Sequence, residues 1–120
     1  MPIDVKECLL DDLPDALIVS DLRGVIQIWN RRAEIIFGIP KDAALGSSLD
    51  IIIPEHLRNA HWAGFYHAIQ LGSVKNGGKS VRTKALLGNG STALMDMTFS
   101  LARNEDSNLI GVIALVRLAH

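Results

Sequence analysis

The sequence predicts an α+β domain in which a five-stranded antiparallel sheet carries helices on one face. Three observations lead to this fold class. Two runs rich in β-branched residues stand near the start of the chain, helical patterns fill its middle, and three strand patterns follow. The 120 residues suit one compact domain, and 48% apolar residues are enough to supply its core.

The first two strands are predicted over residues 16–21 and 24–30, where "ALIVSD" and "GVIQIWN" flank a turn-like "DLRG". Such runs, separated by a short turn, are typical of a β-hairpin. The next segment, "NRRAEIIFGIP", predicts a helix that begins after Asn30, whose side chain can accept a backbone N–H bond, and that ends at Gly38. Short helical turns and loops are expected over residues 41–56.

The clearest helix is predicted over residues 55–71. Helical spacing places five residues on one face, namely Leu57, His61, Gly64, Phe65 and Ala68. Another face receives Ala60, His67 and Leu71. The histidine of the first group therefore lies within an apolar stripe, where such a residue is more often a hydrogen-bonded core side chain than a ligand.

The C-terminal strand patterns follow the flexible segment "GSVKNGG" at residues 72–78. "GNG" predicts a tight hairpin turn between the first two strands, because Asn-Gly tolerates positive φ. Apolar side chains that alternate along the second strand are expected to face one way, at Ala93, Met95, Met97, Phe99 and Leu101. The last strand, residues 108–118, is apolar on both faces, which favours a central position in the sheet.

Charge and composition narrow the class of protein. A net charge of −1 and a pI near 6.4 argue against a general nucleic-acid or membrane-surface partner. No apolar run could span a bilayer and no signal pattern precedes the domain, so we expect a cytoplasmic location. Cys8 is the single cysteine, which excludes an internal disulfide. No nucleophile–base, paired-carboxylate or phosphate-loop pattern is found, and we expect no enzymatic activity.

One long segment resembles a known family. "LPDALIVSDLRGVIQIWNRRAEIIFGIPKDAALGSSL" contains an aspartate followed by "G.I...N.A.E..FG", and it resembles the first half of a PAS domain. The resemblance covers residues 13–118 and implies a sensor domain there, preceded by a cap helix or linker over residues 1–12. PAS domains carry haem, flavin, organic acids, lipids or nothing, so the fold alone does not identify the ligand.

The middle of the chain resembles one branch of that family. "IIIPEHLRNAHWAGFYHAIQLG" is similar to the haem-binding PAS domains of oxygen-sensor histidine kinases, in which "MPE..R..H" introduces the helix that carries the iron ligand. Ungapped counting from Pro54 places that family's axial histidine on His61. The resemblance therefore implies haem b, an iron ligated by His61, and a diatomic gas or a redox change as the signal. Neutral imidazole is a good axial ligand to haem iron.

The same register describes a cofactor pocket that departs from the oxygen sensors. Their distal arginine falls on Val81, and strand alternation should turn its neighbour Arg82 away from the pocket. The resemblance implies a pocket around His61 formed by Leu57, Arg58, Phe65, Val81, Met97, Phe99, Val112 and Ala114. A methionine thioether can ligate ferrous haem, so Met97 is either a sixth ligand or, as is commoner on an inward strand face, a core residue.

Several alternatives stay open from the sequence. A zinc site at His56, His61 and His67 is disfavoured, because spacings of five and six do not place three rings on one helix face and no cysteine is near. A PAS domain that binds a small apolar molecule such as a fatty acid would use the same apolar lining. A third possibility is a cofactor-free PAS domain that serves only for dimerisation.

A homodimer is predicted through the outer face of the sheet. If Val112 and Ala114 face the pocket, then alternation exposes Leu109, Ile113 and Leu115 on the opposite surface, and such apolar patches usually mark an interface. The N-terminal segment can add cover as a short helix, because Val5, Leu9 and Leu13 recur at helical spacing. The alternative is a monomer in which this helix folds back on its own sheet.

Overall fold

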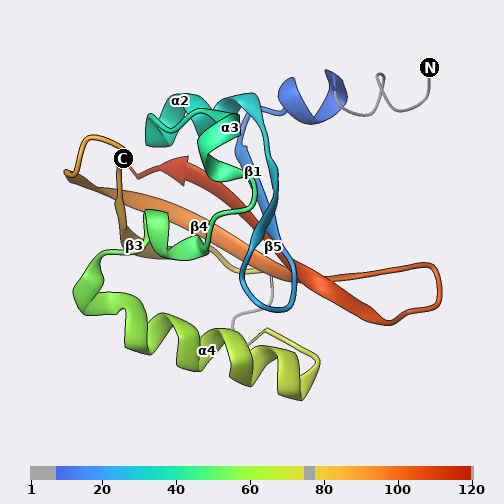
Figure 1. Ribbon diagram of the computed structural model, residues 1–120. Coiled ribbons are helices and arrows are strands. Elements are labelled where there is room, and N and C mark those ends of the chain that lie inside the picture. The colour runs from blue at the N-terminus through green and yellow to red at the C-terminus, as the bar shows by residue number, and fades with distance from the viewer. Residues whose placement is uncertain (1–7, 75–77, 120) are drawn as a thin grey trace.

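The computed structural model describes residues 8–74 and 78–119 (Figure 1). A helical turn over residues 8–11 precedes ten elements. These are β1 (Ala16–Ser20), β2 (Ile26–Trp29), α2 (Arg31–Phe37), α3 (Lys41–Ala44), the 3-10 helices η1 (Leu49–Ile52) and η2 (Glu55–Leu57), α4 (Arg58–Leu71), β3 (Val81–Leu86), β4 (Thr92–Arg103) and β5 (Leu109–Leu118). The predicted cap helix over residues 1–12 lies partly outside the described residues, as does the loop over 72–78.

The five strands form one antiparallel sheet in the order β2-β1-β5-β4-β3. This confirms the predicted fold class and the central position of the last strand. In Figure 1, β4 and β5 run as a long hairpin whose turn projects from the body of the domain, and α4 lies apart from α2 and α3. Side chains from α2, η1 and α4 nevertheless join the inward side chains of the sheet in one buried cluster, so the helices cover a single face.

The β1–β2 hairpin is confirmed, but its turn takes more residues than predicted. The Asp21 carboxylate accepts backbone N–H bonds from Arg23 at 2.9 Å and Val25 at 3.0 Å, and Gly24 has a φ of 82°. These bonds hold the chain in a turn through Val25, because aspartate readily satisfies nearby backbone donors in turns. Strand pairing therefore starts only at Ile26.

Asn30 joins three parts of the chain at the start of α2. Its Oδ1 accepts the N–H of Ala33 at 3.0 Å, which is the predicted helix cap, and also the N–H of Leu17 in β1 at 2.9 Å. Its Nδ2 donates to the carbonyl oxygens of Leu10 at 2.8 Å and Asp15 at 3.1 Å. Asn30 is 1% exposed; its two bonds to backbone N–H groups are buried, and its two bonds to carbonyl oxygens are partly buried.

The predicted end of this helix and the second hairpin turn are also confirmed. Gly38 closes α2 in the left-handed conformation with a φ of 68°, and its N–H donates to Glu34 O. The "GNG" turn connects β3 to β4, where Gly90 has a φ of 88° and Leu87 N donates to Ser91 O at 2.8 Å.

The predicted helix over residues 55–71 is divided into two pieces. Residues Glu55–Leu57 form the 3-10 turn η2, and the α-helix α4 begins at Arg58. The Arg58 side chain folds back over this turn, where Nε donates to Ile53 O at 3.1 Å and Nη2 to Asp50 O at 3.3 Å. With the 3-10 turn η2 before the helix, the Arg58 side chain bonds to the carbonyl groups of both Ile53 and Asp50.

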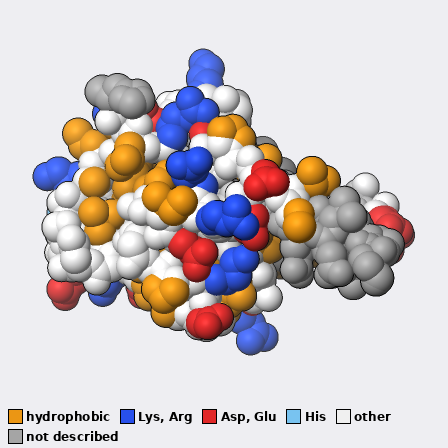
Figure 2. All heavy atoms as spheres, turned by 90° about the horizontal axis from the view of Figure 1, so that it is seen from above, with side chains coloured by type: hydrophobic (Ala, Val, Ile, Leu, Met, Phe, Trp, Pro, Cys, Tyr) orange, Lys and Arg blue, Asp and Glu red, His pale blue; other side chains and the backbone are white. Residues whose placement is uncertain are grey.

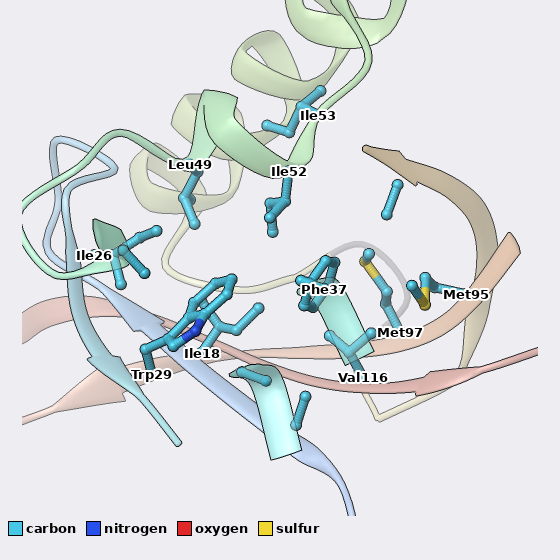
Figure 3. Packing of buried hydrophobic residues seen from close by; sticks show 14 of the residues in the cluster. Ile18, Ile26, Trp29, Phe37, Leu49, Ile52, Ile53, Met95, Met97 and Val116 are labelled. Carbon is cyan, nitrogen blue, oxygen red and sulfur yellow. The ribbon is translucent and has the colours of Figure 1, made fainter. Parts of the chain in front are cut away.

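The core lies between the sheet and the segment that leads into α4 (Figure 3). Figure 3 shows Leu49 and Ile52 on that segment pointing toward the layer of sheet side chains that contains Ile18, Met97 and Val116. All five side chains are at least nine-tenths buried. An open space between these two layers holds the site described below.

The opposite face of the sheet carries Ile113 and Leu115, two of the three residues predicted to form a dimer interface. Leu109 does not share this face, because a register shift between Ala102 and Arg103 pairs it with Arg103, whose side chain reaches Gly72 O on the helix side. Leu115 is 39% exposed and pairs with Leu17 of β1, while Ile113 pairs with Val19, so these residues share one surface. The helical turn over residues 8–11 is tied to the start of α2 through Asn30. On the face shown in Figure 2, acidic and basic side chains lie among apolar ones, without a continuous surface of one sign.

Candidate functional site

A cavity of about 480 Å³ lies between α4, the segment around η1 and the inner face of the sheet. Eight of the nine residues that the resemblance implies as a cofactor pocket line it, namely Leu57, His61, Phe65, Val81, Met97, Phe99, Val112 and Ala114. Most of the remaining wall is aliphatic. A cavity of this volume with a few polar groups is typical of sites that enclose a small molecule or cofactor.

The strand wall of the cavity follows from the register of three strands. Val81 of β3 pairs with Met97 of β4, and Phe99 of β4 pairs with Ala114 of β5. Residues paired across neighbouring strands point to the same face, so these side chains converge. Val112 of β5 pairs with Leu101, the next inward residue of β4, and extends the same wall.

Arg82 lies on the other face of β3, as strand alternation predicts. Its Nε lies 2.9 Å from Asp96 Oδ1 and its Nη2 lies 3.3 Å from Asp96 Oδ2, in an exposed, two-pronged ion pair. The guanidinium is therefore engaged outside the cavity, and the side chain that enters at this point of the strand is that of Val81.

The helical wall presents the predicted ligand. His61 lies on α4 with its ring 5.9 Å from that of Phe65 and 4.7 Å from that of Trp62, measured between ring centroids. Burial lowers the pKa of His61 from its ordinary value of 6.5, although the nearby Asp50 carboxylate acts to raise it. The imidazole is therefore neutral at pH 7 and keeps a free nitrogen lone pair.

One nitrogen of this ring lacks a hydrogen bond. Nδ1 of His61 is buried, and no atom in the described part of the chain pairs with it. A buried polar atom left unpaired costs about 1–3 kcal/mol. A group that entered the cavity and paired with Nδ1 would offset that cost.

Arg58 is the predicted pocket residue that does not line the cavity. Besides its two bonds to backbone carbonyl groups, its Nε lies 3.8 Å from Asp50 Oδ1. The guanidinium thus fixes the turn that precedes α4. Its contribution to the site is the position of the helix that carries His61.

Trp62 holds α4 to two other elements. Its indole Nε1 donates to Asp50 Oδ1 of η1 at 2.7 Å, and its ring packs directly over Gly24 in the β1–β2 turn, where a Cβ atom would collide with it. His61 and Trp62 are adjacent in sequence and in contact. The helix position around His61 is therefore fixed from both η1 and the first hairpin.

Some wall residues were missed by sequence reasoning. Leu49, Ile52 and Ile53 line the cavity, and the apolar run before Pro54 was the signal that could have indicated them. Thr83 also lines it, two residues after Val81 on the same strand face. The assignment of Ala60 to another helix face was wrong, because this small residue also reaches the wall; the exposed residues His67 and Leu71 do not.

Among residues 8–74 and 78–119, no group of three or more His, Cys, Asp or Glu side chains is placed to hold a metal ion. A haem iron differs from a zinc or calcium ion in this respect, because the porphyrin supplies four ligands and the protein needs to provide one. The donor set of this cavity, a single imidazole among apolar side chains, fits that requirement.

A family model described as "PAS fold" matches residues 6–118. The chain belongs to the PAS family. PAS domains are generally sensory signalling modules, and this domain shares their fold with many solved structures. The PAS domain of a protein from Colwellia psychrerythraea superimposes with a TM-score of 0.82 at 18% identity, over 99% of this chain and 98% of that chain. No helix within the described ranges is long and apolar enough to cross a membrane.

Two curated proteins are similar to this PAS domain in sequence. An uncharacterized protein of Azorhizobium caulinodans is 32% identical over 94 residues, which cover 78% of this chain and 13% of that protein. The sensor protein FixL of Bradyrhizobium diazoefficiens is 40% identical over 53 residues, which cover 44% of this chain and 10% of that protein. The chain thus corresponds to roughly a tenth of the length of either relative.

Proposed function

We propose that this PAS domain binds haem b in its cavity through His61, senses a diatomic gas or a redox change there, and passes the change to a partner or effector. The observation that carries the proposal is an imidazole on the wall of an apolar cavity with a buried ring nitrogen that lacks a partner. The 40% identity to a sensor protein over 53 residues supports it.

The residues of the cavity would have separate roles. His61 would hold the cofactor from α4, and the strand residues Val81, Phe99 and Ala114 would pack against it and exclude water. When bound, haem supplies an iron that can take a diatomic ligand and change its charge by one electron. Trp62 would transmit a displacement of His61 to η1 and to the β1–β2 turn, because it contacts all three.

Haem binding is tested by titrating the purified protein with haemin and recording the absorption spectrum. We expect a sharp Soret band that saturates at about one haemin per chain and that persists through gel filtration. A spectrum that stays that of free haemin, with all haemin separated from the protein on the column, would reject the proposal.

A second candidate is a small apolar ligand such as a fatty acid. The aliphatic wall favours it, because Ile18, Leu49, Ile52 and Leu101 also face the cavity. This function would not need His61. Solvent extraction followed by mass spectrometry distinguishes the two, since a colourless preparation that releases one fatty acid per chain would replace haem by this ligand.

The haem-loaded, reduced domain is expected to bind CO readily and O₂ weakly. Val81 provides no hydrogen-bond donor, and the guanidinium of Arg82 is engaged with Asp96 on the other face. A charge-assisted hydrogen bond contributes about 1.5–3 kcal/mol, so its absence lowers O₂ affinity about 10- to 100-fold. Mixing the reduced protein with air should quickly give the spectrum of the oxidised form. A long-lived oxygenated spectrum would contradict this expectation, and Val81→Arg should move the protein toward one.

We also propose that the domain forms a homodimer through the outer sheet face that contains Ile113 and Leu115. Leu115 is 39% exposed on this face, beside apolar residues of β1. Ile113→Glu is expected to convert a dimer to a monomer in sedimentation at tens of micromolar, because it would bury a charge in the interface. Leu71→Glu, on an exposed position of α4, serves as the control. A wild-type protein that sediments as a monomer would reject the dimer.

A further inference from the structure

Thr83 places a hydroxyl group on the strand wall of the cavity. It lies between two inward residues of β3, Val81 in the cavity wall and Ala85 in the buried core. It is paired with Met95 of β4, which is fully buried on the same face of the sheet. The strand register therefore turns this side chain inward, and it contributes to the lining next to Val81.

This hydroxyl is available to a ligand. It makes no hydrogen bond with another described residue. The hydroxyl of Ser20, which also belongs to the wall, instead donates to Asp21 O at 3.0 Å. Lys79 and Lys84 border the cavity too, but both residues are exposed. Thr83 is thus a free neutral donor within the described strand wall.

We propose that Thr83 is a specificity-determining residue whose hydroxyl donates a hydrogen bond to a small ligand held in the cavity. The inference rests on the proposed binding of haem through His61: α4 would supply the coordinating base, and β3 the hydrogen-bond donor. A donor favours ligands that develop partial negative charge, so it raises O₂ affinity more than CO affinity. A neutral hydroxyl does this less than a guanidinium, which agrees with weak rather than absent O₂ binding.

Carbon monoxide is the probe for this contact, because a hydrogen bond to bound CO lowers the C–O stretching frequency. In the haem-loaded, reduced protein we expect Thr83→Val to raise that frequency and to weaken O₂ binding about 3- to 10-fold, the effect of one neutral hydrogen bond. Valine keeps the shape of threonine and suits a strand. Thr83→Ser should restore the wild-type band, and Thr98→Val, on the outer face of β4 opposite Leu115, should leave it unchanged.

The outcomes separate this inference from the proposed function. If wild type and Thr83→Val bind haem equally and show the same C–O frequency, Thr83 is not the donor, although the haem proposal stands. If the wild type binds no haem, both fail. Should Thr83→Val not fold, Thr83→Ala takes its place: a raised C–O frequency supports the hydroxyl as donor, and a wild-type frequency overturns it.

Discussion

Replacing His61 with glycine is expected to abolish haem binding, whereas the same change at His67 leaves it intact. His61 belongs to the cavity wall and has a buried ring nitrogen without a partner, while His67 is an exposed residue of the same helix. Removing the single imidazole of the cavity removes the axial ligand that the protein would supply. The measurement is Soret absorbance per chain after loading with haemin and gel filtration.

The two variants are matched for their effect on the helix. Each replaces one histidine of α4 with glycine, at a similar cost in helix propensity, so a difference in haem content reports the ligand and not helix stability. Free imidazole should restore haem binding to His61→Gly, because it can occupy the space that the side chain leaves. Loss of haem in His67→Gly with retention in His61→Gly would show that the assigned ligand is wrong.

Asn30→Ala is expected to lower the free energy of unfolding by about 3–5 kcal/mol, enough to unfold a marginally stable domain. Alanine would leave two backbone donors, Leu17 N and Ala33 N, and two carbonyl acceptors without this partner. The two donors lose buried bonds and cannot find water easily, whereas the two acceptors lose partly buried ones. Urea denaturation followed by circular dichroism measures the loss.

The control for this change is Asn89→Ala. Asn89 also accepts two hydrogen bonds, from Ser91 N at 3.0 Å and Ser91 Oγ at 2.7 Å, but it lies in an exposed turn. Water can replace these bonds, so we expect a loss below about 1 kcal/mol. Equal losses for the two variants would contradict the view that burial makes Asn30 a structural centre of the fold.

The parts of the fold that were predicted correctly have strong local signals. Both ends of α2 follow from single residues, because Asn30 caps it and Gly38 adopts the left-handed conformation that ends it. The alternation along β4 shows which side chains face inward, and the apolar character of β5 shows that it is central. Side-chain period and turn chemistry operate within a few residues, so they can be read without knowing the fold.

The start of α4 could not be predicted in this way. Helical periodicity extends back to Glu55, but the structure has a 3-10 turn there. The difference depends on Arg58, which reaches back to carbonyl groups of Ile53 and Asp50. Such a bond depends on where η1 lies relative to α4, and that placement is a property of the whole domain.

In the candidate site too, some residues could be predicted from a local sequence signal, whereas others are positioned by tertiary packing. A family resemblance and strand alternation identified the wall residues on α4, β3, β4 and β5, because they follow a register. The wall residues on η1 were missed, since their inward position follows from packing of the 3-10 segment. Thr83 was also missed, although strand alternation from Val81 turns it to the same face and could have predicted it. Arg58, which the resemblance implied as a pocket residue, lies outside the cavity lining.

The most direct test of the central claim is the resonance Raman spectrum of the reduced, haem-loaded domain. Coordination by His61 predicts an iron–imidazole stretching band that shifts when the protein is labelled with ¹⁵N-histidine. The band should be absent from His61→Gly and should return, without the isotope shift, when unlabelled imidazole is added. A wild-type protein that holds haem but shows no isotope-sensitive iron–imidazole band would contradict the account.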